Sequence, residues 1–252
     1  MGETKLSFKR YEKKYLLSRE TYERLMAGLA PYIEPTDYHR SYIRSIYYDS
    51  DDFRLIRHSL DAPVYKEKLR VRSYSREPGM DAPVFVELKK KYKGIVYKRR
   101  LVMSGGEAEA WLSGETSAPE DSQMAREIAW FLHENPLRPK VMIACDRLAW
   151  QAKDDPELRI TFDESIRWRE DRLRMDQGGD GEELLPQGHV LMEIKLPEAA
   201  PLWLAHLLSE LEVYPTSFSK YGTCFKDQLL REYFFDTEPQ ESETESGVIS
   251  FV

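Results

Sequence analysis

The chain has 252 residues, of which 41% are hydrophobic and 32% are charged, and its formal net charge at pH 7 is −7. This length and hydrophobic content fit one large domain with a hydrophobic core. Cys145 and Cys224 are the only cysteines, which excludes a disulfide framework or a cysteine metal site. The N-terminal residues lack the apolar segment of a signal peptide, and no window is apolar enough to span a membrane, so we expect a cytoplasmic protein.

Two periodicities divide the chain into strands and helices. Alternation with a period of two marks the strands, and helical spacing of apolar residues marks amphipathic helices, the first of which has Ser18 as its N-cap. In chain order we expect a strand at 7–17, a helix after Ser18, a strand at 41–49, a helix at 51–60, strands at 64–75, 83–91 and 96–103, helices at 106–114 and 122–135, strands at 140–151 and 158–165, a polar loop at 172–188, a strand at 189–196, and helices at 199–211 and 219–233.

Eight strands can close a barrel that is wide enough to hold a ligand. We therefore expect an α+β fold, an eight-stranded antiparallel β-barrel with surrounding helices, formed by residues 1–233. Residues 234–252 form an acidic tail, in which the segment from Asp236 to Gly247 carries acidic but no basic side chains. Such a segment is expected to be disordered and solvated.

The predicted strands carry charged residues at alternate positions, and most of them carry apolar residues in between. Because alternate side chains share one face of a strand, each of these strands has an apolar face that must pack and a charged face. The charged faces hold many more cations than carboxylates, although the chain as a whole is acidic. The cations are Arg10, Lys14, Lys68, Arg70, Arg72, Lys89, Lys98, Arg100, Arg147, Arg159 and Lys195, and the carboxylates are Glu12, Glu87, Asp163 and Glu193.

Two interpretations of these charged faces are open. They could form the solvated outer face of an open antiparallel sheet, where Lys and Glu alternate for solubility. Alternatively, helices cover the apolar outer face and the charged face lines the barrel. The excess of cations and the frequency of arginine, whose fork suits phosphate oxygens, favour the second interpretation. A lining of this charge is strongly self-repulsive without an anion, so it predicts a polyanionic ligand, best a phosphate chain.

Carboxylates inside a cationic lining make chemical sense if a divalent cation lies between them and the phosphates. Mg²⁺ and Mn²⁺ take one or two protein carboxylates together with phosphate oxygens. Glu193 is the first candidate for such a ligand, and Glu12 and Glu87 are further candidates that could equally be ion-pair partners. The sequence has neither a phosphate-binding P-loop nor a Rossmann glycine motif, so side chains must hold any nucleotide.

The segments with these residues resemble a known family. The chain is similar to VTC-type polyphosphate polymerase domains, within the CYTH-like superfamily of triphosphate tunnel metalloenzymes. The matching segments are FKRYEKKYLL at 8–17, IYYDS at 46–50, KEKLRVRSY at 66–74, VFVELKKK at 84–91, CDRLAW at 145–150, LRITFD at 158–163, VLMEIKLP at 190–197 and FSKYGTC at 218–224.

This resemblance implies an antiparallel tunnel in which basic side chains grip a triphosphate and a glutamate holds Mn²⁺ or Mg²⁺. It also implies transfer of the γ-phosphoryl group of ATP to a growing inorganic polyphosphate chain that leaves through the tunnel. By position, Glu193 matches the metal-binding glutamate, and the phosphate-binding residues match Lys14, Arg70, Arg72, Lys89, Lys98, Arg147 and Lys220, with Ser219 beside the last. We expect the catalytic set to be Lys14, Arg70, Arg72, Lys89, Arg147 and Glu193.

Two positions depart from related patterns. Arg10 stands where the hydrolase and cyclase branch has the first residue of its Glu-x-Glu-x-Lys motif, which disfavours that branch, and Cys145 stands where the polymerase pattern has tyrosine. The alternatives are a tripolyphosphatase or nucleoside triphosphatase on the same scaffold, and a noncatalytic sensor of polyphosphate or inositol phosphate. No nucleic-acid partner is expected, because no outward aromatic residues interleave with the basic ones. The family implies a membrane-protein partner that this sequence does not show, and the oligomeric state is open.

Overall fold

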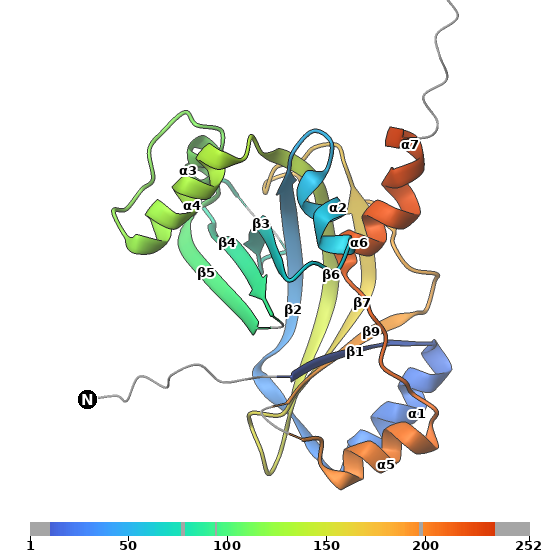
Figure 1. Cartoon of the computed structure of the whole chain (residues 1–252). Helices are drawn as coiled ribbons and strands as arrows, with labels where there is room; N and C mark the ends of the chain where they lie inside the picture. The colour runs from blue at the N-terminus through green and yellow to red at the C-terminus, as the bar shows by residue number, and fades with distance from the viewer. Residues whose placement is uncertain (1–10, 77–78, 94, 197–198, 235–252) are drawn as a thin grey trace, which may run out of the picture.

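A computed structural model describes residues 11–76, 79–93, 95–196 and 199–234 of the chain. One antiparallel sheet dominates this part, with strands in the order β1-β9-β7-β6-β2-β3-β4-β5 and the short β8 paired to β7 (Figure 1). The strands are β1 (Tyr11–Leu17), β2 (Ile33–Asp49), β3 (Tyr65–Ser73), β4 (Pro83–Tyr92), β5 (Ile95–Ser104), β6 (Arg138–Ala152), β7 (Arg159–Arg169), β8 (Glu182–Glu183) and β9 (Val190–Leu196).

All eight predicted strands are present, and the predicted α+β fold is confirmed. The second strand is longer than predicted, since β2 begins at Ile33 rather than at residue 41. A register shift between Pro35 and Arg40 interrupts its pairing with β6, and this irregularity hides the early part of the strand from a period-two pattern. The expected loop at 172–188 contains β8, whose two residues pair with Arg167 and Trp168.

The predicted helices are also present, and side-chain caps begin several of them. Ser18 caps the first helix by accepting a hydrogen bond from the Thr21 amide, as expected. The predicted helix at 219–233 is instead three consecutive short helical segments, the second of which is a π-helix. The helices are α1 (Arg19–Leu29), α2 (Arg54–Leu60), α3 (Gly105–Leu112), α4 (Gln123–Glu134), α5 (Leu202–Glu210), α6 (Lys220–Cys224), η1 (Phe225–Leu229) and α7 (Leu230–Phe234).

The apolar face of the sheet packs against helices, as the alternation predicts. Leu69, Val86 and Leu88 of β3 and β4 are fully buried in one cluster with Trp111 of α3 and Ile128 of α4. A second cluster joins β1, β7 and β9 to α1 and α5, and Figure 1 shows these two helices side by side below β1. Burial of each large aliphatic side chain stabilises the fold by about 1.5–3 kcal/mol. Because this packing holds the apolar face against the helices, the charged residues lie on the opposite face of the sheet.

The sheet curls so that its two ends approach each other across the charged face. Lys89 on β4 interacts electrostatically with Glu12 on β1 and with Glu193 on β9, although β4 lies near the opposite end of the strand order. Within the described residues β1 and β5 are edge strands and do not pair with each other. The concave charged surface enclosed by this curl is called the tunnel face below.

Two further sequence expectations concern membrane-spanning segments and the acidic tail. None of the described helices is long and apolar enough to cross a membrane. The acidic tail predicted at 234–252 lies outside the described residues except for Phe234, the last residue of α7, so its disorder stays a prediction.

Candidate functional site

Cross-strand register aligns the predicted basic residues in rows on the tunnel face. Lys68 of β3 is opposite Lys89 of β4, which is opposite Lys98 of β5. In the adjoining row Glu87 lies between Arg70 and Arg100. Residues two apart on a strand share a face, so the two rows are neighbours on the same surface. The structure thus brings together the basic residues that the sequence placed on three separate strands.

Glu87 is the common partner of three cations in these rows. Its carboxylate is fully buried, and it accepts hydrogen bonds from Arg70 Nε and Arg100 Nε, each at 2.8 Å. Lys98 Nζ lies 2.7 Å from Glu87 Oε1. Burial alone would raise the pKa of this carboxyl, but Arg70, Arg72 and Lys98 lower it to about 2. The structure therefore shows Glu87 as an ion-pair partner, the alternative to its predicted metal-binding role, which stays untested.

Asp163 is the common partner of a second group of cations, Arg147 and Lys220. Arg147 grips its carboxylate through two parallel hydrogen bonds, from Nε at 2.5 Å and from Nη2 at 2.7 Å. Lys220 Nζ at the start of α6 also bonds to Asp163 Oδ2. The carboxyl group is almost completely buried, and the two cations outweigh its desolvation and hold its pKa below the usual range. This arrangement fixes the Arg147 fork and pins α6 to β7.

The segment before α6 crosses the tunnel face and contacts β1 and β3. The Thr216 amide donates a hydrogen bond to the Lys14 carbonyl of β1. Lys14 Nζ donates to the Phe218 carbonyl at 3.0 Å, and Lys68 Nζ of β3 donates to Ser219 Oγ at 3.1 Å. Ser219 also caps α6 by accepting a hydrogen bond from the Gly222 amide. This segment therefore bridges β1 and β3 across the tunnel face.

Three lysines on the tunnel face have, among the described residues, one carboxylate within ion-pair distance, that of Glu12 beside Lys14. Lys14, Lys68 and Lys89 are electrostatic neighbours, and each is only partly exposed. Burial lowers the pKa of Lys68 to about 8, and the charges of Lys89, Lys66 and Lys14 add to this lowering against the opposing effect of Tyr47. Burial also lowers the pKa of Lys89. Such mutual repulsion is relieved when an anion binds among the three ammonium groups.

Glu193 faces this lysine group from β9. Its side chain is 12% exposed and lies 2.7 Å from Lys195 Nζ. Despite burial, Lys195, Lys14 and Arg147 lower the pKa of the Glu193 carboxyl to about 2, so it is an anion at neutral pH. Glu12 is more exposed and lies 3.5 Å from Lys14 Nζ.

An ionised carboxylate beside a phosphate site is the donor that a hard cation such as Mn²⁺ or Mg²⁺ takes. Within the described part of the chain, no three His, Cys, Asp or Glu side chains are grouped so that they could hold a metal by themselves. This donor set fits a cation held by one carboxylate, Glu193, together with oxygens of a bound phosphate. The metal roles of Glu193 and Glu12 remain predictions.

The remaining predicted residues lie in different settings. Arg72 is on the tunnel face, where its Nε donates to Ser45 Oγ at 3.1 Å. Arg159 is exposed and lies opposite Lys195 in the β7–β9 register, and its Nε donates to the Pro156 carbonyl just before β7. Arg10 is outside the described residues. Cys145 is buried, and burial raises the pKa of its thiol to about 11, which keeps it neutral.

Sequence reasoning missed Tyr47, which lies among the arginines of the tunnel face. Its buried hydroxyl accepts a hydrogen bond from Arg70 Nη1 at 3.3 Å, and its ring stacks on Tyr221 with a centroid distance of 4.7 Å. Burial would raise the pKa of this phenol, but Arg70, Arg72 and Lys68 lower it to about 8. Tyr47 and Ser45 are two residues apart on β2, so they share the face on which Arg70 and Arg72 of β3 contact them.

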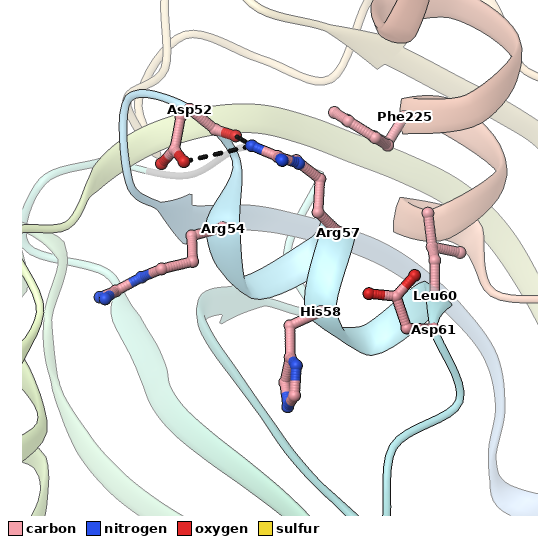
Figure 2. A pocket seen from close by; sticks show the side chains of 7 residues that line it. All are labelled: Asp52, Arg54, Arg57, His58, Leu60, Asp61 and Phe225. Atoms are coloured by element: carbon pink, nitrogen blue, oxygen red, sulfur yellow. Dashed lines mark hydrogen bonds and ion pairs between the residues drawn. The ribbon is translucent and has the colours of Figure 1, made fainter.

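A cavity of about 430 Å³ lies between α2 and η1, away from the predicted site residues. Its lining includes Asp52, Arg54, Arg57, His58 and Phe225. Figure 2 shows Arg57 directed toward Asp52, to which its Nη1 donates at 3.2 Å, while Arg54 and His58 point away from Phe225. The basic groups here are already engaged, since Arg54 also bonds to Asn135, so this cavity offers a weaker anion site than the tunnel face.

Comparison with known proteins agrees with this geometry. Residues 9–227 match the VTC domain family. The chain is 26% identical over 218 residues to vacuolar transporter chaperone complex subunit 4 of Trypanosoma brucei brucei. That match covers 71% of this chain and 27% of the relative, so the chain spans about a quarter of the relative's length.

Solved structures share the fold at low sequence identity. A proposed adenylate cyclase from Bacillus halodurans has a TM-score of 0.52 and 16% identity, with 88% of this chain and 96% of that chain covered. A proposed adenylyl cyclase from Hippeastrum, described as having a dominant triphosphatase activity, has a TM-score of 0.51 and 15% identity, with coverages of 86% and 94%. At these identities the likeness shows the fold alone. Because the family match runs from residue 9 to residue 227, the chain belongs to the VTC domain family.

Proposed function

We propose that this domain is a metal-dependent polyphosphate polymerase that transfers the γ-phosphoryl group of ATP to a growing inorganic polyphosphate chain. The observation that carries the proposal is the group of Lys14, Lys68 and Lys89, which faces Glu193 and in which, among the described residues, only Lys14 has a carboxylate within ion-pair distance, that of Glu12. Elsewhere on the tunnel face, Glu87 is shared by Arg70, Lys98 and Arg100, and Asp163 by Arg147 and Lys220, so positive charge is in excess there too. The lysine group differs because it lies beside Glu193, where a triphosphate and a metal ion would meet.

In this mechanism an oxygen of the terminal phosphate of the acceptor chain attacks the γ-phosphorus of ATP. The bond from that phosphorus to the oxygen bridging to the β-phosphate breaks, and ADP leaves while the chain gains one phosphate. Phosphoryl transfer mainly requires that the protein position the reacting phosphates and stabilise their negative charge. The attacking oxygen is already ionised at neutral pH, so no general base is needed.

The residues of the tunnel face have distinct parts in this reaction. Lys14, Lys68 and Lys89 bind the phosphate oxygens, and Arg147 presents a guanidinium whose orientation is fixed by Asp163. Arg70 and Arg72 are oriented by Glu87 and Ser45, respectively. A Mn²⁺ or Mg²⁺ ion on Glu193, when bound, supplies further positive charge to the phosphate oxygens. Preorganised cations of this kind act without reorganisation during the transfer.

The proposal is tested by incubating the purified protein with ATP and MnCl₂ and separating the products by gel electrophoresis. Long polyphosphate is expected, with ADP formed in proportion to the phosphate incorporated. Glu193→Gln is expected to abolish the product, while Glu20→Gln, the same change at an exposed position on α1, leaves it unchanged. Release of orthophosphate alone would indicate a hydrolase instead, and anion binding that survives chelation without turnover would indicate a sensor.

The relative's printed name describes a subunit of a vacuolar transporter chaperone complex. By this likeness we also propose that a membrane-protein partner receives the product of this domain, and that the domain itself is cytoplasmic. Purification of the native protein in detergent, followed by identification of co-purifying membrane proteins, tests both proposals. Recovery of the protein only from the soluble fraction and without a partner would contradict the proposed assembly.

A further inference from the structure

A second row of like charges adjoins the lysine group on the tunnel face. Lys66 of β3 is directly opposite Lys91 of β4, one row nearer the β4–β5 hairpin than Lys68 and Lys89. Because side chains two apart on a strand share a face, Lys66 and Lys91 face the same way as the tunnel lysines. Like charges directly opposite each other on neighbouring strands destabilise a sheet, so two consecutive rows of them are unusual.

The opposite face of the same strands shows how such lysines are normally compensated. Lys90, the neighbour of Lys91, lies 2.6 Å from Glu127 of α4 and 3.6 Å from Glu67 of β3. Neither Lys66 nor Lys91 has a carboxylate partner within the described part of the chain. Lys90 is therefore neutralised by carboxylates of the protein itself, whereas Lys66 and Lys91 are not.

Lys66 and Lys91 are continuous with the group of Lys14, Lys68 and Lys89 rather than a separate surface patch. Lys66 is half-buried, and its Nζ donates to the Ser59 carbonyl at 3.1 Å, which holds the ammonium near α2. Burial lowers the pKa of Lys66, with a further lowering from Lys91, and Lys66 in turn acts on Lys68. Lys91 is exposed. The unpaired charge thus runs from the interior of the tunnel face outward to the hairpin.

We propose that Lys66 and Lys91 form an outer subsite that binds phosphates of a polyphosphate chain beyond the three held by the inner lysines. This subsite rests on the proposed function, since it needs a ligand longer than a triphosphate. A chain bridging the two rows relieves the repulsion of both like-charged pairs. A triphosphate held by Lys14, Lys68 and Lys89 leaves the outer pair unoccupied. The subsite therefore makes affinity depend on chain length.

The experiment measures the affinity of the whole chain for tripolyphosphate and for long-chain inorganic polyphosphate by calorimetry. Lys91→Gln and Lys66→Gln/Lys91→Gln are compared with Lys90→Gln, the same change one residue away on the outer face. Loss of one charge-assisted contact corresponds to about tenfold in affinity. We expect Lys91→Gln to weaken long-chain binding about tenfold and tripolyphosphate binding less than twofold, and Lys90→Gln to change neither.

The outcomes separate this inference from the proposed function. If the wild-type protein binds neither anion, the proposed function fails and the subsite fails with it. If both anions bind, but Lys91→Gln weakens the binding of both equally or of neither, the proposed function stands and the subsite is overturned. Lys91 is exposed, so its replacement leaves folding intact, and this single variant decides the question even if the double variant is destabilised.

Discussion

Replacement of Glu87 by glutamine is expected to destabilise the fold strongly, because it removes the negative charge that three tunnel cations share. The carboxylate is fully buried, with Arg70 and Arg100 donating at 2.8 Å and Lys98 at 2.7 Å. Removing one partner of a buried ion pair costs about 3–5 kcal/mol. Glu127→Gln is the matched control, because Glu127 also binds a lysine and an arginine but is 25% exposed, so its loss costs at most about 1 kcal/mol.

Urea denaturation followed by tryptophan fluorescence measures both free energies of unfolding. Tripolyphosphate should restore much of the stability of Glu87→Gln, because a bound anion replaces the missing charge and stabilises the folded state by mass action. At a ligand concentration of about 100 times Kd this gain is about 2.7 kcal/mol. A loss below about 1 kcal/mol for Glu87→Gln, equal to that of the control, would refute the view that Glu87 neutralises the tunnel cations.

Three further predictions concern titration and reactivity. The folded-state pKa of Glu87 and Glu193 is about 2, below the ordinary value of 4.5. The stability that these two carboxylates contribute is therefore complete above about pH 4.5 and is lost as the pH falls toward 2. In Glu87→Gln, the free energy of unfolding should decrease less steeply with falling pH over this range. The affinity for tripolyphosphate should fall above about pH 8, where Lys68 loses its proton. Lys68→Arg should move this fall to higher pH. The same pH dependence of affinity in Lys68→Arg and the wild type would contradict this role of Lys68. Burial raises the pKa of Cys145 and Cys224, so thiol reagents should label them only on unfolding, and rapid labelling of the native protein would show otherwise.

The strand pattern placed the predicted basic residues of β3, β4 and β5 on one face, because alternation fixes the side of each strand, but it did not single out Tyr47, Lys66 or Lys91. It could not predict which carboxylate neutralises which cation, since that depends on cross-strand register. The sequence made Glu193 the first candidate for a metal ligand and Glu87 a further one, and only pairing shows that Glu87 lies between Arg70 and Arg100 while Glu193 faces the lysine group. The ion pair of Asp163 with Lys220 likewise joins residues that are distant in the sequence, so alternation could not predict it.

The enclosure of the site was also beyond sequence reasoning. The contacts of Phe218 with Lys14 and of Ser219 with Lys68 join residues that are 204 and 151 positions apart in the sequence. Tyr47 was missed for a different reason, because a tyrosine in an apolar strand reads as a core residue. Its place among Arg70, Arg72 and Lys68 depends on the curl of the sheet, which strand alternation does not specify.

The central claim is that the tunnel face transfers phosphoryl groups from ATP to a phosphate chain rather than to water. ³¹P NMR of the protein with ATP and Mg²⁺, recorded after removal of the metal with chelator, measures this directly. We predict that the signal of internal chain phosphates grows as the γ-phosphate signal of ATP declines, and that Glu193→Gln removes both changes. Growth of the orthophosphate signal alone, with no internal chain phosphate, would contradict the claim.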